Sequence, residues 1–214
     1  MPVPGYIIFG PNEHGQDITV ADVRALPLAE RTLALKRRLD RLLVGQIDEL
    51  AKVQNGSRVV YSPFPLAVLT CVAIETVGQV FHGPSKDDPK EAFVWMANRI
   101  DRMLSRKPPK AFKTAATVRW PNKKNQKFDS YSDVIYHFFR NTLIHGYHGR
   151  GVYLTEDETQ TWSPDDGFLY VNPYWFWTAF RRVYDELFRE LDENPNDNNR
   201  LRMKCREYVE RMLY

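Results

Sequence analysis

Cysteine is scarce in this sequence: the chain has two, Cys71 and Cys205, and they form no CxxC pair. Two distant thiols argue against a disulfide framework and a thiolate zinc site, and they are typical of a protein in a reducing compartment. Long apolar runs are also missing. The longest stretch without a charge, residues 59–74, contains two prolines and is shorter than the ~20 residues that span a membrane. Residues 1–17 show neither the basic start nor the apolar centre of a signal peptide. These features predict a soluble, cytoplasmic protein that does not enter a membrane.

Acidic residues are missing from one long segment. Residues 102–127 hold nine of the 30 Lys and Arg residues and no Asp or Glu, although the formal net charge of the whole chain is only +3. A basic block of this kind attracts phosphate backbones. We therefore predict a basic loop over residues 106–127 that contacts RNA. A solvated loop that only keeps the protein soluble is the alternative.

The apolar residues recur at steps of three and four, which predicts amphipathic helices. Asn55-Gly56 ends the first helix, Ser62-Pro63 begins the second, and Asn172-Pro173 begins the fifth. The second helix is apolar on all sides, which places it at the centre of the fold. The predicted helices cover residues 28–53, 63–81, 88–105, 131–145, 173–191 and 200–213.

Short apolar runs predict a minor amount of β structure. Residues 6–9 form one such run, and residues 152–154 and 168–171 are expected to pair as a small hairpin around an acidic loop. The sequence thus predicts a mainly α fold: a single domain over residues 1–214, built as a bundle of five to six helices with a minor β-hairpin. Its core is expected over about residues 28–191, followed by the C-terminal helix.

The end of the fourth helix combines residues suited to the cleavage of a phosphodiester. Asn141 and His145 are four residues apart and share one helix face, whereas Arg140 lies roughly 140° around the axis from His145. A histidine moves protons near neutral pH, and an arginine neutralises the charge that grows on a phosphate. RNA supplies its own nucleophile, the 2′-hydroxyl, so we expect no metal and no other cofactor. A second copy of the helix across a dimer would complete the Arg–His pair.

The run Arg140-Asn141-Thr-Leu-Ile-His145 resembles the Arg-X4–6-His motif of the HEPN superfamily, which comprises helical-bundle ribonucleases and nucleotide-binding proteins. An aromatic helix leads into the motif, and residues 71–78 resemble the buried acidic helix that many members carry. The resemblance implies a homodimer with both motif helices at one composite cleft, and metal-independent RNA cleavage that leaves a cyclic phosphate. It also implies that Arg140 grips the phosphate, that His145 acts as acid or base, and that Asn141 positions both.

The predicted function is therefore that of an endoribonuclease, as a toxin or defence effector whose partners are RNA and an antitoxin or regulatory protein. Two alternatives stay open: a non-catalytic module that binds RNA, a nucleotide or a protein, and a structural protein whose product is its dimer interface. The residues expected to contact RNA are Lys113, Arg119, Lys123, Lys124, Lys127 and His148.

Several of these residues also have a purely structural interpretation. Glu75 is the one charge inside an apolar helix and should be paired if it is buried. Arg140 is one candidate partner, in which case Glu75 supports the site by holding the arginine; otherwise Glu75 reaches solvent. His145, near the end of its helix, also suits the negative end of the helix dipole.

Two further hypotheses concern a metal site and an aromatic surface on which bases could stack. His145 and His148 could bind a metal together with Glu75 or His137, but nearby glycines indicate that the helix has ended, so no metal is expected and His137 is expected to pack. The aromatic residues within 170–177 could stack bases. Their helical spacing favours packing in the core or at a dimer interface.

Overall fold

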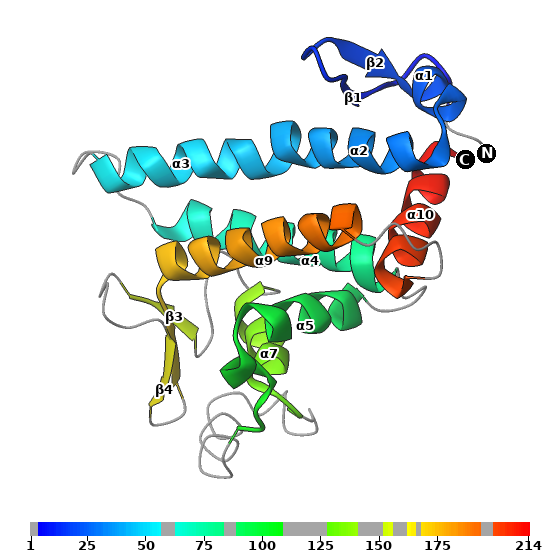
Figure 1. Cartoon of the computed structure of the whole chain (residues 1–214). Helices are drawn as coiled ribbons and strands as arrows, with labels where there is room; N and C mark the ends of the chain where they lie inside the picture. Colours follow the sequence, from blue (N-terminus) through cyan, green and yellow to red (C-terminus); the bar gives the residue numbers. More distant parts are fainter. Residues whose placement is uncertain are drawn as a thin grey trace.

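The computed structural model describes residues 4–56, 63–83, 89–108, 128–140, 152–155, 162–165, 168–193 and 199–214. These residues form a mainly helical fold, as the sequence predicts, with two small sheets (Figure 1).

The first predicted helix is one long helix interrupted by a π-helical turn. It consists of α2 (Leu28–Leu39), the π turn η1 (Asp40–Val44) and α3 (Gly45–Gly56). In the π turn the backbone N–H of Gly45 donates to the carbonyl of Asp40, five residues earlier. A Cβ at position 45 would stand 2.6 Å from that carbonyl oxygen, so the turn suits a glycine. The sequence periodicity predicts the helix but not this widened turn.

The second predicted helix, α4 (Pro63–His82), is the centre of the molecule. It packs against α3, α5 (Pro89–Ile100), α9 (Pro173–Glu193) and α10 (Arg200–Leu213). Its approach to α5 is close at Gly78, where an added Cβ would overlap the carbonyl oxygen of Ala92. Of the described helices, α4 is the one long and apolar enough to cross a membrane, but 56% of its most apolar stretch is buried. This burial is consistent with a core helix of a soluble protein.

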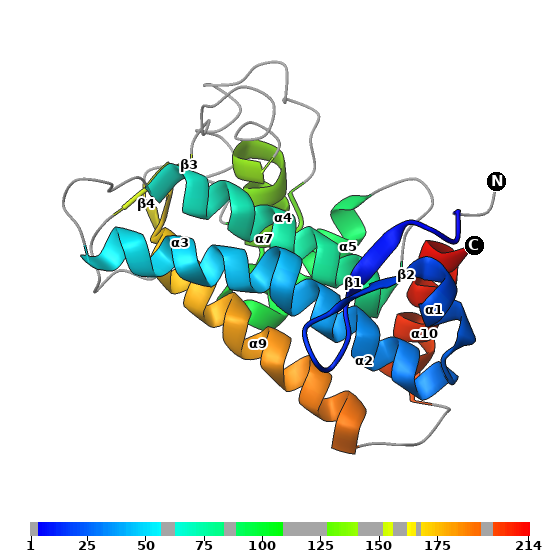
Figure 2. The same ribbon diagram turned by 90° about the horizontal axis from the view of Figure 1, so that it is seen from above.

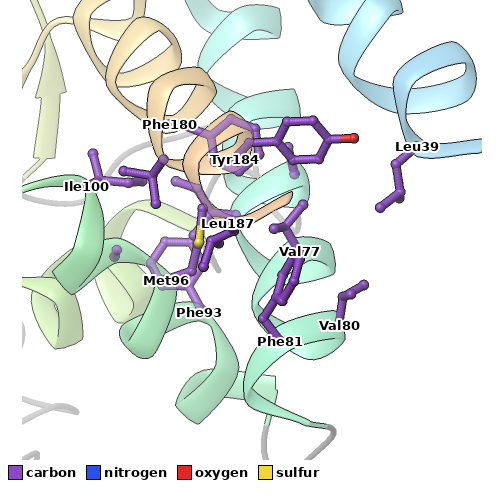
Figure 3. Packing of buried hydrophobic residues seen from close by; sticks show 14 of the residues in the cluster. Leu39, Val77, Val80, Phe81, Phe93, Met96, Ile100, Phe180, Tyr184 and Leu187 are labelled. Atoms are coloured by element: carbon purple, nitrogen blue, oxygen red, sulfur yellow. The ribbon is translucent and has the colours of Figure 1, made fainter. Parts of the chain in front are cut away.

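The core lies between α4, α5 and α9, and α2 covers one side (Figure 3). Phe81 of α4 meets Phe188 of α9 edge to face, with ring centroids 5.1 Å apart. Full burial of a side chain of this size contributes roughly 1.5–3 kcal/mol. Figure 3 shows Phe93 and Met96 of α5 pointing towards the same cluster.

Two polar contacts tie α9 to the long helix. The hydroxyl of Tyr184 donates to Oδ1 of Asp40 at 2.7 Å, and the indole Nε1 of Trp177 donates to Oδ1 of Asp48 at 2.9 Å. Burial and the neighbouring Asp40 carboxylate raise the pKa of Tyr184, so this phenol stays protonated and keeps donating. In Figure 2 α9 runs beside the long helix that it contacts.

The third predicted helix, over residues 88–105, is shorter than expected. α5 ends at Ile100, and a separate 3-10 turn, η2 (Arg102–Ser105), follows it. The break is at Asp101, which has an extended backbone and whose side chain accepts from the backbone N–H of Met103 at 2.8 Å. Asp101 thus caps η2 instead of continuing α5.

The strands correct one prediction. Residues 152–154 (β3, Val152–Leu154) do pair with residues 168–171 (β5, Phe168–Val171), but in parallel and not as a hairpin. The hairpin partner of β5 is β4 (Trp162–Asp165), which lies in the connection between them. Parallel strands need a connection of about a dozen residues or more, and residues 155–167 are long enough to provide it.

The N-terminal segment forms a second small sheet on α2. The strand expected at residues 6–9 is β1 (Ile8–Pro11), and it pairs antiparallel with β2 (Asp17–Thr19). A short helix, α1 (Val20–Ala25), follows β2 and was not predicted. α10 packs against α1 and α2, so both ends of the described chain close the same side of the bundle (Figure 2).

Candidate functional site

The helix that carries the Arg140–His145 motif begins at a capping box. It starts as α7 (Tyr131–Val134) and continues as a π turn, η4 (Ile135–Arg140), with which its described part ends. Ser130 accepts from the backbone N–H of Asp133, and Asp133 accepts in return from the backbone N–H of Ser130 at 2.9 Å. These reciprocal bonds satisfy donors that a helix start leaves open.

Lys90 of α5 forms an ion pair with the first turn of this helix. Its Nζ lies 2.8 Å from Oδ1 of Asp133, whose side chain is almost fully buried. Burial alone would raise the pKa of Asp133, but Lys90, Ser130 and the backbone of Asp129 outweigh it and lower the pKa. The carboxylate therefore stays ionised and links α5 to the motif helix.

The π turn η4 places Arg140 next to α4, where it reaches Glu75. Tyr136, at the start of this turn, packs on Phe93 of α5 with ring centroids 5.4 Å apart. The guanidinium carbon of Arg140 lies 5.3 Å from the centre of the Tyr136 ring, a cation–π distance. His137 contacts the rings of Phe128 and Tyr136, which confirms the prediction that it packs.

Glu75 and Arg140 form the ion pair that the sequence suggested. Nη2 of Arg140 lies 2.6 Å from Oε2 of Glu75, and the two side chains are only 16% and 15% exposed. The charge that interrupts the apolar sequence of α4 is thus paired with the first residue of the motif, and the alternative that Glu75 simply reaches solvent is wrong. Because both groups have lost most of their water, each compensates the charge of the other.

Cys71 lies one helical turn before Glu75 on α4 and is fully buried. Burial raises the pKa of its thiol, Glu75 raises it further, and Arg140 opposes both. Burial also raises the pKa of Cys205, to about 12. Both thiols are therefore protonated at neutral pH and act as packing groups, not as nucleophiles or metal ligands.

The other predicted site residues lie outside the described part of the chain. This holds for the catalytic candidates Asn141 and His145 and for the residues expected to contact RNA, which are Lys113, Arg119, Lys123, Lys124, Lys127 and His148. Of the predicted site, the structure brings together Arg140 and Glu75. Within the described residues, no three His, Cys, Asp or Glu side chains gather as a metal site would require.

Comparison with known proteins adds no relative. No protein-family model, curated protein or solved structure matches this chain. The HEPN resemblance therefore remains an expectation that depends on the sequence motif.

The aromatic residues at the start of α9 pack in or against the core, which is the interpretation that their helical spacing favours. Phe176 is fully buried, and Trp177 is nearly so. Asn172 caps the helix by accepting from the backbone N–H groups of Tyr174 and Trp175, at 2.9 and 3.1 Å. The indole of Trp177 is turned towards Asp48 of α3 and so is not a stacking platform for bases.

Sequence reasoning missed two residues that shape this region. Lys90 contacts the motif helix from α5, and Tyr136 lies within that helix beneath Arg140, but neither has a distinctive sequence signal. Lys90 is an ordinary charge in the first turn of α5, and Tyr136 is one aromatic among several. The contact of Lys90 is tertiary, with Asp133, whereas Tyr136 contacts Arg140 four residues later in the same turn.

Proposed function

We propose that this protein is a HEPN-like, metal-independent endoribonuclease that acts in the cytoplasm as a homodimer. The observation that carries this proposal is the ion pair between Glu75 and Arg140. It holds the first residue of the Arg140–His145 motif in a water-poor position, in which electrostatic interactions are strong. An arginine restrained by a carboxylate on one side and a tyrosine ring on another is pre-organised and needs little reordering to meet a phosphate.

The proposed reaction uses the 2′-hydroxyl of RNA as the nucleophile. A base removes the hydroxyl proton, the 2′-oxygen attacks the adjacent phosphorus, and the bond to the 5′-oxygen breaks. An acid protonates the leaving 5′-oxygen, so the products are a 2′,3′-cyclic phosphate and a 5′-hydroxyl. We assign the proton transfers to His145, the neutralisation of the phosphate charge to Arg140, and the orientation of both groups to Asn141.

The partners in this proposal are RNA, a second copy of the chain, and an antitoxin or regulatory protein that restrains the enzyme. The basic residues of segment 106–127 would attract the RNA backbone. The two copies would face each other across their motif helices, because one helix places Arg140 and His145 on different faces.

The test uses a labelled single-stranded RNA pool in EDTA, cut by the parent and by His145→Ala. We expect the variant to lose cleavage by at least about a hundredfold, the usual scale of general acid–base catalysis. Circular dichroism and gel filtration of the variant control for the fold and the oligomeric state. Equal cleavage rates would overturn the proposal.

A non-catalytic module that binds RNA or a nucleotide is the second candidate. The observation that favours it is that Arg140 already has an ion-pair partner and a stacking partner in its own chain. In that case the parent binds RNA without cutting it, and His145→Ala binds with unchanged affinity. Binding measured on the same RNA pool therefore separates the two functions.

A further inference from the structure

A cavity of about 270 Å³ lies where the end of α4 and the beginning of α10 meet α5 and α9. Phe81 and Leu201 contribute apolar surface to it, and His82, Trp95 and Arg99 form one polar and aromatic wall. His82 is seven residues after Glu75 on α4, two helical turns or roughly 10 Å along the axis. The cavity is therefore separate from the region around Arg140.

Arg99 lies over the ring of Trp95 on this wall. Its guanidinium carbon lies 4.3 Å from the centre of the Trp95 ring. The Trp95 ring in turn contacts His82, with centroids 5.7 Å apart. The guanidinium is planar, so its N–H donors lie in one plane, the geometry that recognises carboxylate and phosphate oxygens.

The cavity has an excess of positive charge. Arg200 at the start of α10 joins Arg99, whereas Glu190 is the single carboxylate among the described lining residues. Neither arginine forms an ion pair within the described part of the chain. Two arginines and one glutamate thus line the cavity, and both arginines are exposed to solvent, so a solute can reach them.

His82 adds a group that can donate a hydrogen bond. Burial lowers its pKa, Arg200 and Lys204 lower it further, and Glu91 opposes them. The ring is therefore neutral at pH 7 and carries one N–H. A bound anion would favour the charged ring and so raise the pKa of His82.

We propose that this cavity binds a small oxyanion, the phosphate group of a free or organic phosphate, between Arg99, Arg200 and His82. Phe81 and Leu201 would contact the carbon part of an organic phosphate. The volume lies just below the range of about 300–1,000 Å³ for ligand pockets, which suits a small molecule and not a polymer.

The first experiment titrates the full chain with inorganic phosphate by calorimetry. We expect saturable binding with a Kd in the millimolar range. Arg99→Ala should weaken binding at least tenfold. Arg102→Ala is the matched control, because Arg102 lines the adjoining cavity and not this one, and its affinity should stay within twofold of the parent. Unsaturable binding, or equal affinity of Arg99→Ala and the parent, would overturn the proposal.

Two further measurements complete the experiment. One uses a variant that should keep its fold, and the other compares phosphate with a carboxylate. Arg99→Lys keeps the charge but not the planar donors, so it should bind phosphate more weakly than the parent while it retains the parent's circular dichroism. Acetate is the carboxylate probe and should bind more weakly than phosphate, which carries more oxygens and more charge. Acetate binding as tight as that of phosphate contradicts the assignment to a phosphate group.

The pH dependence tests His82 directly. Sulfate keeps its charge across the range, so its affinity should rise as the pH falls through the pKa of His82, and His82→Gln should remove this rise. The other charged groups that face the ring are Arg99 and Glu91 on α5, Glu190 on α9, and Arg200 and Lys204 on α10. An unchanged pH dependence in His82→Gln would contradict contact between His82 and the anion.

Discussion

At the scale of single residues, Arg140 is the most constrained of the predicted site residues in the described chain. Its guanidinium is paired with Glu75 and stacked on Tyr136, and little of the side chain is exposed. Buried ion pairs rarely add much stability, because desolvation offsets their attraction. Removal of one partner is costly, however, since an uncompensated charge is then left behind. The pair thus fixes Arg140 in place more than it stabilises the fold.

Glu75→Gln tests this account of Arg140. The substitution keeps the shape of the side chain and removes its charge, so we expect the free energy of unfolding to fall by about 2–3 kcal/mol, somewhat below the usual cost for a fully buried pair because both groups retain some water. Urea denaturation of the parent and the variant measures the change.

The pair Glu49–Lys52 is the matched control for this experiment. Its N–O distance is also 2.6 Å, but both side chains are 70% exposed. Water compensates either charge there, so Glu49→Gln should leave the denaturation midpoint unchanged. If Glu49→Gln and Glu75→Gln were equally harmless, burial would not be what makes the Glu75–Arg140 pair matter.

At the scale of elements, the motif helix depends on its first turn. Its described part is short, with four residues of α helix and a six-residue π turn. The capping box and the ion pair with Lys90 stabilise this first turn.

Ser130→Ala should therefore destabilise the protein by about 1 kcal/mol, a typical cost for the loss of an N-cap. Thermal unfolding detects this loss, and Ser130→Thr, which keeps the hydroxyl, should recover most of it. Since α7 leads directly to Arg140, the alanine variant should also reduce RNA cleavage. A variant as stable as the parent would show that packing alone holds the helix start.

The pH dependence of stability should carry a contribution from Asp133. Its pKa is lower in the folded chain than the ordinary value of 3.8, so below that value the unfolded chain binds its proton first. The stabilisation is complete above the ordinary pKa and is lost as the pH falls through the folded pKa. Asp133→Asn should consequently be less stable than the parent at pH 7, and the difference should shrink under more acidic conditions. A difference independent of pH would contradict this role for the carboxylate.

The sequence predicts the elements of this fold better than their contacts. The helices α2–α3, α4, α9 and α10 follow from apolar spacing and, for α9, from the cap Asn172, which are local signals. The short helix α1 also has such a signal, the capping box of Thr19 and Asp22, but its six residues are too few to show a helical period. The π turns have no sequence signal that apolar periodicity reveals, because they depend on backbone hydrogen bonds such as the bond from the N–H of Gly45 to the carbonyl of Asp40.

Tertiary pairing explains the remaining differences. The parallel arrangement of β3 and β5 depends on the path of the chain between them, which alternation of apolar residues does not specify. The Glu75–Arg140 pair could be suggested because a lone charge in an apolar helix demands a partner. The Lys90–Asp133 pair could not be suggested from the sequence, since both residues look like ordinary surface charges there.

At the scale of the whole molecule, the uneven charge is the feature that concerns RNA. Segment 102–127 contains an excess of cations, whereas the remainder is acidic. RNA approaching the protein would therefore be oriented by one segment.

Replacement of Lys123, Lys124 and Lys127 by Ala should weaken RNA binding and flatten its salt dependence. Each phosphate contact with a single strand contributes about 0.7 to the slope of log affinity against log salt, so three lost contacts should reduce the slope by about 2. Fluorescence anisotropy at several salt concentrations gives this slope. Replacement of Lys36, Lys52 and Lys204, which form ion pairs elsewhere on the protein, is the control with the same loss of charge. Equal slopes for the two triple variants would contradict a specific role for the segment.

The central claim is that the Arg140–His145 motif cleaves RNA through its own 2′-hydroxyl, and end-group analysis tests it most directly. The purified parent is incubated in EDTA with an end-labelled RNA and with the same oligonucleotide carrying a 2′-O-methyl group at the cut position. We predict fragments with 2′,3′-cyclic phosphate ends from the first substrate, none from cleavage at the blocked position, and none from either with His145→Ala. Cleavage at the blocked position, 3′-hydroxyl ends, or undiminished cutting by His145→Ala would contradict the account.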